Sequence, residues 1–137
     1  MQMQQLVHPI DTLGKVVDEE RLLEFQKQVR QAHVAESVRR YILDLVHATR
    51  AHLALALGAS PRGSLALFRT AQATAALRGR DFVIPDDVKH MAVACLAHRL
   101  VMNPENILSG ENSEDVVREL LKQTEVPVAR SGQRRLA

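Results

Sequence analysis

Apolar side chains recur at helical spacing along most of this chain of 137 residues. The clearest case lies between residues 36 and 50, where five positions at i, i+4, i+7, i+8 and i+11 share one face of a helix. Aromatic residues, which sheet cores favour, make up only 3% of the chain, and this argues against a large all-β core. The five residues of the stripe are Val38, Ile42, Leu45, Val46 and Thr49.

Caps and prolines divide the chain into about five helices. Asp18 is a good N-cap, and proline suits the first helical position, where no N–H is needed. Gly79 fits just past the end of one helix, and the stretch around Gly110 is expected to be a loop. Phe82–Ile84 is β-like but too short to found a sheet. The sequence predicts an all-α protein, a small helical bundle with room for one very short β pair. The helices are expected to begin near Glu19, Glu36, Pro61, Pro85 and Ser113.

The chain is expected to form one helical domain, residues 18–125, with a segment on either side. Residues 1–17 are expected to be an extended lead-in with a turn, because Pro9 disfavours helix at the residue before it. Residues 126–137 contain three arginines and no acid, and are expected to be a disordered basic tail.

The net charge of +2 belongs to that tail, since residues 1–125 alone carry −1. The domain has no excess of positive charge with which to bind a nucleic acid backbone. Its longest apolar stretches are far shorter than the roughly 20 residues of a membrane span, and its start lacks the layout of a signal peptide. Cys95 is the single cysteine. These features predict a cytoplasmic protein with no membrane or nucleic acid partner.

Motifs of catalysis and metal binding are missing from this sequence. Gly14-Lys15 is not a P-loop, because Pro9 stands where its first glycine would be and Val16 follows the lysine. Residues 16–19 resemble the end of a Walker B strand, but the apolar run is too short, and helix capping explains both acids. The six histidines show no metal-ligand spacing, and Cys95 falls on an apolar helical stripe. We expect neither enzymatic activity from this chain alone nor a metal site.

Arg62 is the residue whose position most suggests a ligand. Ser60 suits the N-cap and Pro61 the first position of a helix, which puts Arg62 in its first turn. A cation at the positive end of a helix is unfavourable by about 0.3–1 kcal/mol. An anion bound there would reverse this effect, because arginine can donate two hydrogen bonds to a phosphate. The alternative is a surface arginine paired with a nearby acid.

Several stretches in combination resemble the C-terminal lid domain of MoxR-type AAA+ ATPases. The resemblance covers residues 6–125, nearly the whole chain, and no single stretch would be specific enough alone. The stretches are His8–Ile10, Gly58–Leu65, Gly79–Val83, Pro85–Val88 and His98–Leu100.

The resemblance implies that Arg62 is the sensor 2 arginine, which reaches from the lid to the γ-phosphate of ATP, with Ser60 and Pro61 fixing the start of its helix. Gly63 departs from the alanine usual in the family. ATP and magnesium would bind only to an ATPase core, which lies outside this chain and to which residues 1–17 would lead. The parent would be a chaperone-like ATPase for cofactor insertion or complex assembly. Its expected partners are the core of its own chain and that of a neighbouring subunit in a ring, expected to be a hexamer, together with von Willebrand factor A proteins.

Two other hypotheses stay open. Residues 79–88 also resemble the loop and last helix of a histone fold, which would make the chain a helical DNA-binding module. Against this, Gly58 and Pro61 interrupt the long central helix that a histone fold needs, and the net charge of residues 1–125 is negative. The second alternative is a stand-alone helical adaptor.

Overall fold

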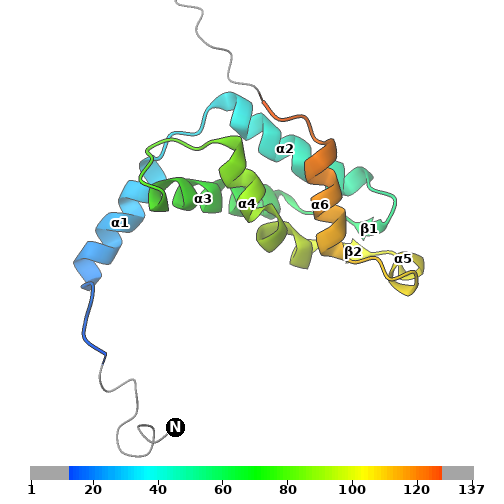
Figure 1. The fold of residues 1–137 in the computed structure, drawn as a ribbon, viewed down its shortest axis with the longest axis horizontal. Coiled ribbons are helices and arrows are strands. Elements are labelled where there is room, and N and C mark those ends of the chain that lie inside the picture. The colour runs from blue at the N-terminus through cyan, green and yellow to red at the C-terminus, as the bar shows by residue number, and fades with distance from the viewer. Residues whose placement is uncertain (1–12, 128–137) are drawn as a thin grey trace, which may run out of the picture.

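The computed structural model describes residues 13–127, and it forms a helical bundle with one short sheet (Figure 1). This confirms the predicted fold class. The expectations for most of the lead-in and for most of the tail lie outside the described residues. No helix within residues 13–127 is long and apolar enough to cross a membrane. The α-helices in this range are α1 (Glu19–Gln31), α2 (Glu36–Ala51), α3 (Pro61–Leu77), α4 (Pro85–Leu96), α5 (Pro104–Leu108) and α6 (Ser113–Gln123).

The core lies where α2, α3, α4 and α6 meet. All five residues of the predicted stripe on α2 are buried, as the helical spacing requires. Ala71 and Ala75 of α3 are completely buried and face the core, and their small side chains allow α4 to pack closely. The interior is filled mainly by aliphatic side chains of these four helices, including Leu45, Leu67, Val88, Leu96 and Val117.

One very short β pair is present, and it joins two distant parts of the chain. Strands β1 (Leu55–Leu57) and β2 (Val101–Met102) pair antiparallel. The β-like run at residues 82–84 takes no part in this sheet, and Phe82 makes only an isolated bridge with His33. A short 3-10 helix, η3 (Ala97–Arg99), connects α4 to β2.

The loop expected around Gly110 contains the additional helix α5. Pro104 occupies its first position, which needs no N–H donor, and the helix stops before Gly110, whose φ is +87°. Conversely, no long helix spans residues 36–77, because α2 ends at Ala51 and β1 lies between it and α3. This arrangement does not fit the central helix of a histone fold.

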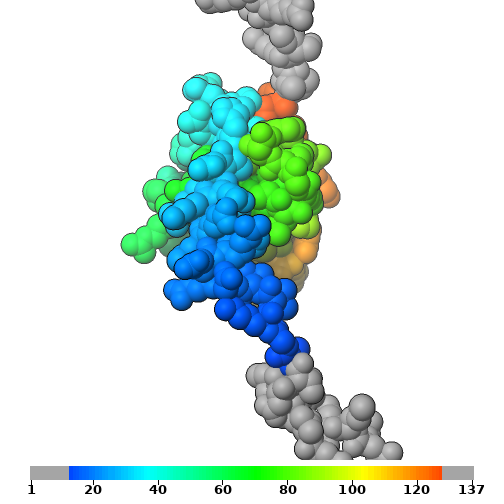
Figure 2. Space-filling view, turned by 90° about the vertical axis from the view of Figure 1, so that its left-hand side faces the viewer, coloured from blue at the N-terminus to red at the C-terminus, as the bar shows by residue number. Residues whose placement is uncertain are grey.

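Helix α1 begins where the sequence predicts, with the Asp18 side chain accepting a hydrogen bond of 2.8 Å from the Arg21 N–H. Its apolar face is only partly covered by the rest of the described chain, through contacts with α3. Leu22 and Phe25 are about half exposed, and no residue of α1 is buried. Figure 1 shows α1 extending away from the bundle on the left. Figure 2 views the molecule from that side and shows α1 in blue at the front.

Candidate functional site

Arg62 lies in the first turn of α3, as the sequence predicts. Ser60 has the extended backbone of an N-cap, and Pro61 takes the first helical position. The Ser60 side chain makes no capping hydrogen bond, whereas the side chains of Asp18 and Asn112 cap α1 and α6. The first turn of α3 also holds no acidic residue. Its positive end therefore has no side-chain acceptor from its own cap or first turn.

The Arg62 side chain is exposed and has no carboxylate partner within residues 13–127. The alternative explanation from the sequence, a surface ion pair, is therefore not seen in the described part of the chain. Four other arginines of the described range, Arg21, Arg78, Arg80 and Arg118, do contact a carboxylate.

The loop before α3 is held by the end of α2. The Ala59 N–H donates a 2.9 Å hydrogen bond to Oγ1 of Thr49, and Nε of Arg50 donates one of 2.9 Å to the Ala59 carbonyl. The Thr49 hydroxyl in turn donates to the Val46 carbonyl at 2.6 Å. Thr49 is completely buried, so these bonds form away from competing water. Together they fix both backbone polar groups of Ala59, three residues before Arg62.

These hydrogen bonds of Ala59 with Thr49 and Arg50, called the clamp below, can form only because residue 58 is glycine. A Cβ at Gly58 would lie 2.7 Å from Cα and N of Arg50 and from the Thr49 carbonyl carbon, all of which are backbone atoms. The loop thus passes directly over the last turns of α2. Sequence reasoning placed Thr49 on the buried face of α2 and missed this role, although a hydroxyl on an otherwise apolar stripe was an available signal.

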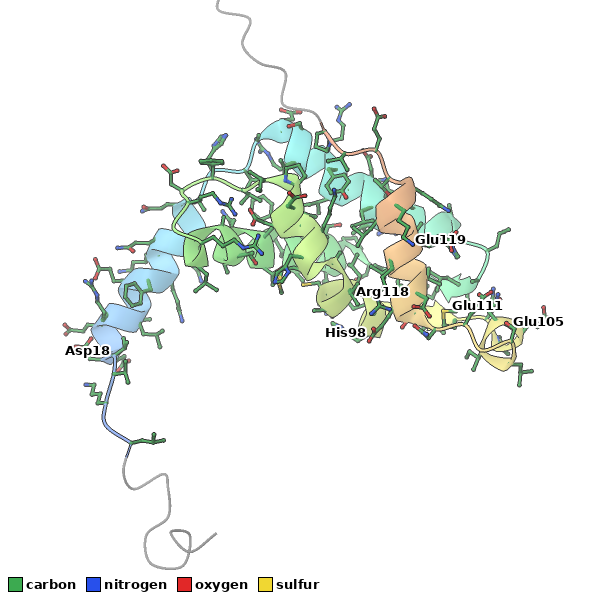
Figure 3. All side chains as sticks on the ribbon, in the orientation of Figure 1. Asp18, His98, Glu105, Glu111, Arg118 and Glu119 are labelled. Atoms are coloured by element: carbon green, nitrogen blue, oxygen red, sulfur yellow. The ribbon has the colours of Figure 1, made fainter. Side chains whose placement is uncertain are left out.

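The end of α4 packs against the first turn of α3 at Gly63. A Cβ at Gly63 would lie 3.3 Å from Cδ2 of Leu96 and 3.8 Å from Cδ of Arg99. Arg99 is exposed, and its Nη1 lies 2.7 Å from Nε2 of the neighbouring His98. Figure 3 places His98 just beyond α4, far from Asp18 at the start of α1. Three segments thus meet at the start of α3: the end of α2, residues 58–60, and the end of α4 with η3.

A buried carboxylate fixes the opposite end of α3. Asp87, in the first turn of α4, is completely buried and receives hydrogen bonds from Arg80 at 2.6 and 2.8 Å and from Arg78 at 3.0 Å. The Ile84 N–H adds a fourth at 3.0 Å. Burial by itself would raise the pKa of Asp87, but these hydrogen bonds and the two arginine charges outweigh it and lower the pKa. Sequence reasoning placed Asp87 in this first turn but missed its burial and its partners.

Other candidate chemistry is sparse within residues 13–127. No group of three or more His, Cys, Asp or Glu side chains gathers there to hold a metal ion. Cys95 is buried, with its Sγ 3.2 Å from the Thr70 hydroxyl. A large groove, about 760 Å³, lies between α1, the second half of α3 and residues 79–81, remote in sequence from Arg62. Among the features of the described residues, the start of α3, with its uncapped N–H groups and an exposed arginine, has the composition typical of an anion site.

Comparisons with known proteins agree on the family. The family model of AAA lid domains matches residues 47–120. The protein YeaC of Bacillus subtilis is 41% identical over 134 residues, a match that covers 98% of this chain and 42% of YeaC. The chaperone MoxR1 of Mycobacterium tuberculosis is 33% identical over 115 residues, covering 77% of this chain and 30% of that protein.

A solved structure has the same fold as this chain. The crystal structure of a candidate ATPase from Cytophaga hutchinsonii superposes with a TM-score of 0.80 at 29% identity, covering 83% of this chain and 37% of the other. The chain spans less than half the length of each of these proteins. A family match over more than half of the chain, relatives of the MoxR type and a shared fold lead to one conclusion. The chain belongs to the AAA lid domain family, as a lid domain of a MoxR-like AAA+ ATPase.

Proposed function

We propose that this lid closes over ATP held by an ATPase core and senses the γ-phosphate through Arg62 as the sensor 2 arginine. The observation that carries the proposal is the charge at the start of α3. Arg62 is exposed there, with no carboxylate partner in the described range, and neither the Ser60 side chain nor an acid of the first turn neutralises the helix end. A γ-phosphate would accept hydrogen bonds from the guanidinium and lie at the positive end of the helix.

Ser60 and Pro61 have a positioning role in this proposal. Pro61 presets the backbone of the first turn, and residues 58–59 are clamped by Thr49 and Arg50. Arg62 therefore projects from a fixed backbone, so that its contact with a phosphate costs little ordering of the chain. A single charge-assisted hydrogen bond contributes about 1.5–3 kcal/mol, which is enough to shift a lid between two positions.

The whole protein, on this proposal, is a chaperone-like ATPase that binds ATP with magnesium in its core and works as a ring, with a hexamer as the expected size. The name of MoxR1, a chaperone, supports this role. The lid would contact the core of its own chain and that of a neighbouring subunit. Cofactor insertion or complex assembly with von Willebrand factor A proteins, in the cytoplasm, is the expected setting. The core supplies the chemistry of hydrolysis, and this chain supplies the closing contact.

The test measures the ATP hydrolysis rate of Arg62→Ala and Arg62→Lys in the full-length protein. It also measures the thermal stability of Arg62→Ala in the isolated chain. Arg62→Ala should slow ATP hydrolysis at saturating ATP, because the lost contact is to the phosphate that is transferred. Arg62→Lys should restore only part of the rate, since a point charge cannot replace the guanidinium fork. Arg30→Ala is the matched control, because Arg30 is also exposed but lies on α1.

Thermal melts of the isolated chain separate function from folding. Arg62→Ala should leave its melting temperature unchanged or slightly raised, because an unfavourable contact between a cation and the helix dipole is removed. A large loss of stability together with a normal ATPase rate in the full-length protein would make Arg62 a structural residue. The stand-alone adaptor would then be the better hypothesis.

A further inference from the structure

We propose that Arg99 is a second phosphate-binding arginine of the site that Arg62 marks. This inference rests on the proposed function and adds to it a contact from a different element. Arg62 extends from the start of α3, whereas Arg99 ends the 3-10 helix η3 after α4. The two are 37 positions apart in sequence, but the packing of α4 and η3 against the first turn of α3 places the side-chain stem of Arg99 beside Gly63, the neighbour of Arg62.

Gly63 makes this approach possible. Because it has no side chain, Leu96 and the methylene stem of Arg99 lie against the first turn of α3, with Cδ of Arg99 3.8 Å from where a Cβ would be. Gly63 is the residue directly after Arg62. The stem of Arg99 is therefore fixed beside the first turn of α3, and its guanidinium extends from that point into solvent.

Three arginines near the start of α3 have no ion pair within the described residues. Within the described residues Arg50, Arg62 and Arg99 have no carboxylate within 4 Å, although other arginines of the chain do. Arg50 uses its Nε on the Ala59 carbonyl and so helps to position the loop. An anion contacted by both Arg62 and Arg99 would be attracted by both positive charges.

His98 favours a defined orientation of the Arg99 side chain. Its Nε2 lies 2.7 Å from Nη1 of Arg99, and a neutral imidazole can accept a hydrogen bond there. The remaining N–H groups of the guanidinium stay available for a ligand. An arginine fork with a free edge matches the oxygens of a phosphate group, so the expected contact of Arg99 is a phosphate of the bound nucleotide.

The experiment measures binding of a non-hydrolysable ATP analogue and of ADP to the full-length protein. Arg99→Gln keeps the methylene stem beside Gly63 and removes the charge, so packing is preserved. We expect it to weaken binding of the ATP analogue by about tenfold or more, as for a lost charged hydrogen bond, and binding of ADP by less. Arg99→Lys should recover part of the loss. Arg30→Gln, on α1, should bind both nucleotides like the wild type.

Arg62→Gln, measured in parallel, separates the two claims. If it weakens binding of the ATP analogue while Arg99→Gln binds like the wild type, the inference about Arg99 is wrong and the role of Arg62 stands. If both variants bind like the wild type, both claims are wrong. If Arg99→Gln lowers the melting temperature without nucleotide but leaves both affinities unchanged, Arg99 is structural and the inference is overturned. Losses in the double variant that differ from the sum of the single losses would support a shared ligand.

Discussion

Asp87 shows how one side chain can hold two helices together. It is completely buried between the end of α3 and the start of α4, and Arg78, Arg80 and the Ile84 N–H occupy its oxygens. A buried carboxylate is tolerated only with such partners, and removing one member of a buried ion pair is costly because the other charges stay behind. The arrangement ties the chain at Gly79, where φ is +69°, to the beginning of α4.

We expect Asp87→Asn to lower the free energy of unfolding by about 3 kcal/mol at neutral pH, because two arginines lose their counter-charge. The pH dependence gives a sharper signature. Since folding lowers the pKa of Asp87, its stabilisation is complete above the unfolded pKa of about 3.9 and is lost as the pH falls through the lower folded value. Urea unfolding followed by circular dichroism should therefore show the difference between wild type and variant shrinking in strong acid.

A difference that stays constant from neutral pH to pH 2 would contradict this account of Asp87, because it would show that the charge of the carboxylate contributes nothing. Lys89→Ala is a suitable control, since the ion pair of Lys89 in the described structure is with the exposed Asp86, at 3.5 Å. Exposed pairs of this kind contribute at most about 1 kcal/mol.

At the scale of elements, the start of α3 depends on the loop that precedes it. Residues 58–59 lie against the last turns of α2. Two hydrogen bonds hold Ala59 there, and the absence of a side chain at Gly58 allows the close approach. No capping side chain helps to define where α3 begins. The clamp from α2 is therefore what fixes the direction in which Arg62 leaves the backbone.

Gly58→Ala should destabilise the domain by about 1–3 kcal/mol, the usual cost of overpacking, because the new Cβ would meet backbone atoms at 2.7 Å. Gly14→Ala is the matched control, since nothing lies within 4 Å of a Cβ there. Chemical denaturation of both variants checks the prediction. Equal stability of the two would mean that the loop can move away from α2 at no cost, and the clamp would not position Arg62.

Local signals predicted most elements, and tertiary contacts account for the rest. The stripe on α2, the cap at Asp18 and the prolines at 61 and 85 act within one or two turns of helix, so the sequence reveals them directly. The pairing of β1 with β2 joins residues about 45 positions apart, and strands of two or three residues carry almost no local signal. The Thr49–Ala59 bond and the burial of Asp87 were missed for the same reason.

At the scale of the whole molecule, the sequence also indicated the family, because several motifs occur together in the right order. What it could not indicate is which surfaces are left uncovered. The apolar face of α1 has the spacing of a buried face, yet Leu22 and Phe25 are half exposed. The position of Arg62 was predicted, whereas its missing ion pair and the approach of Arg99 across Gly63 depend on how α3 and α4 pack.

The most direct measurement of the central claim is the position of the lid in the full-length protein as a function of bound nucleotide. A donor dye at the exposed Gln123 of α6 and an acceptor on the core would report the lid position by energy transfer. We predict that a non-hydrolysable ATP analogue closes the lid and that ADP does so much less. Arg62→Ala should remove this difference, while Arg30→Ala should keep it. Closure by the analogue to the same extent in Arg62→Ala and wild type would contradict the account.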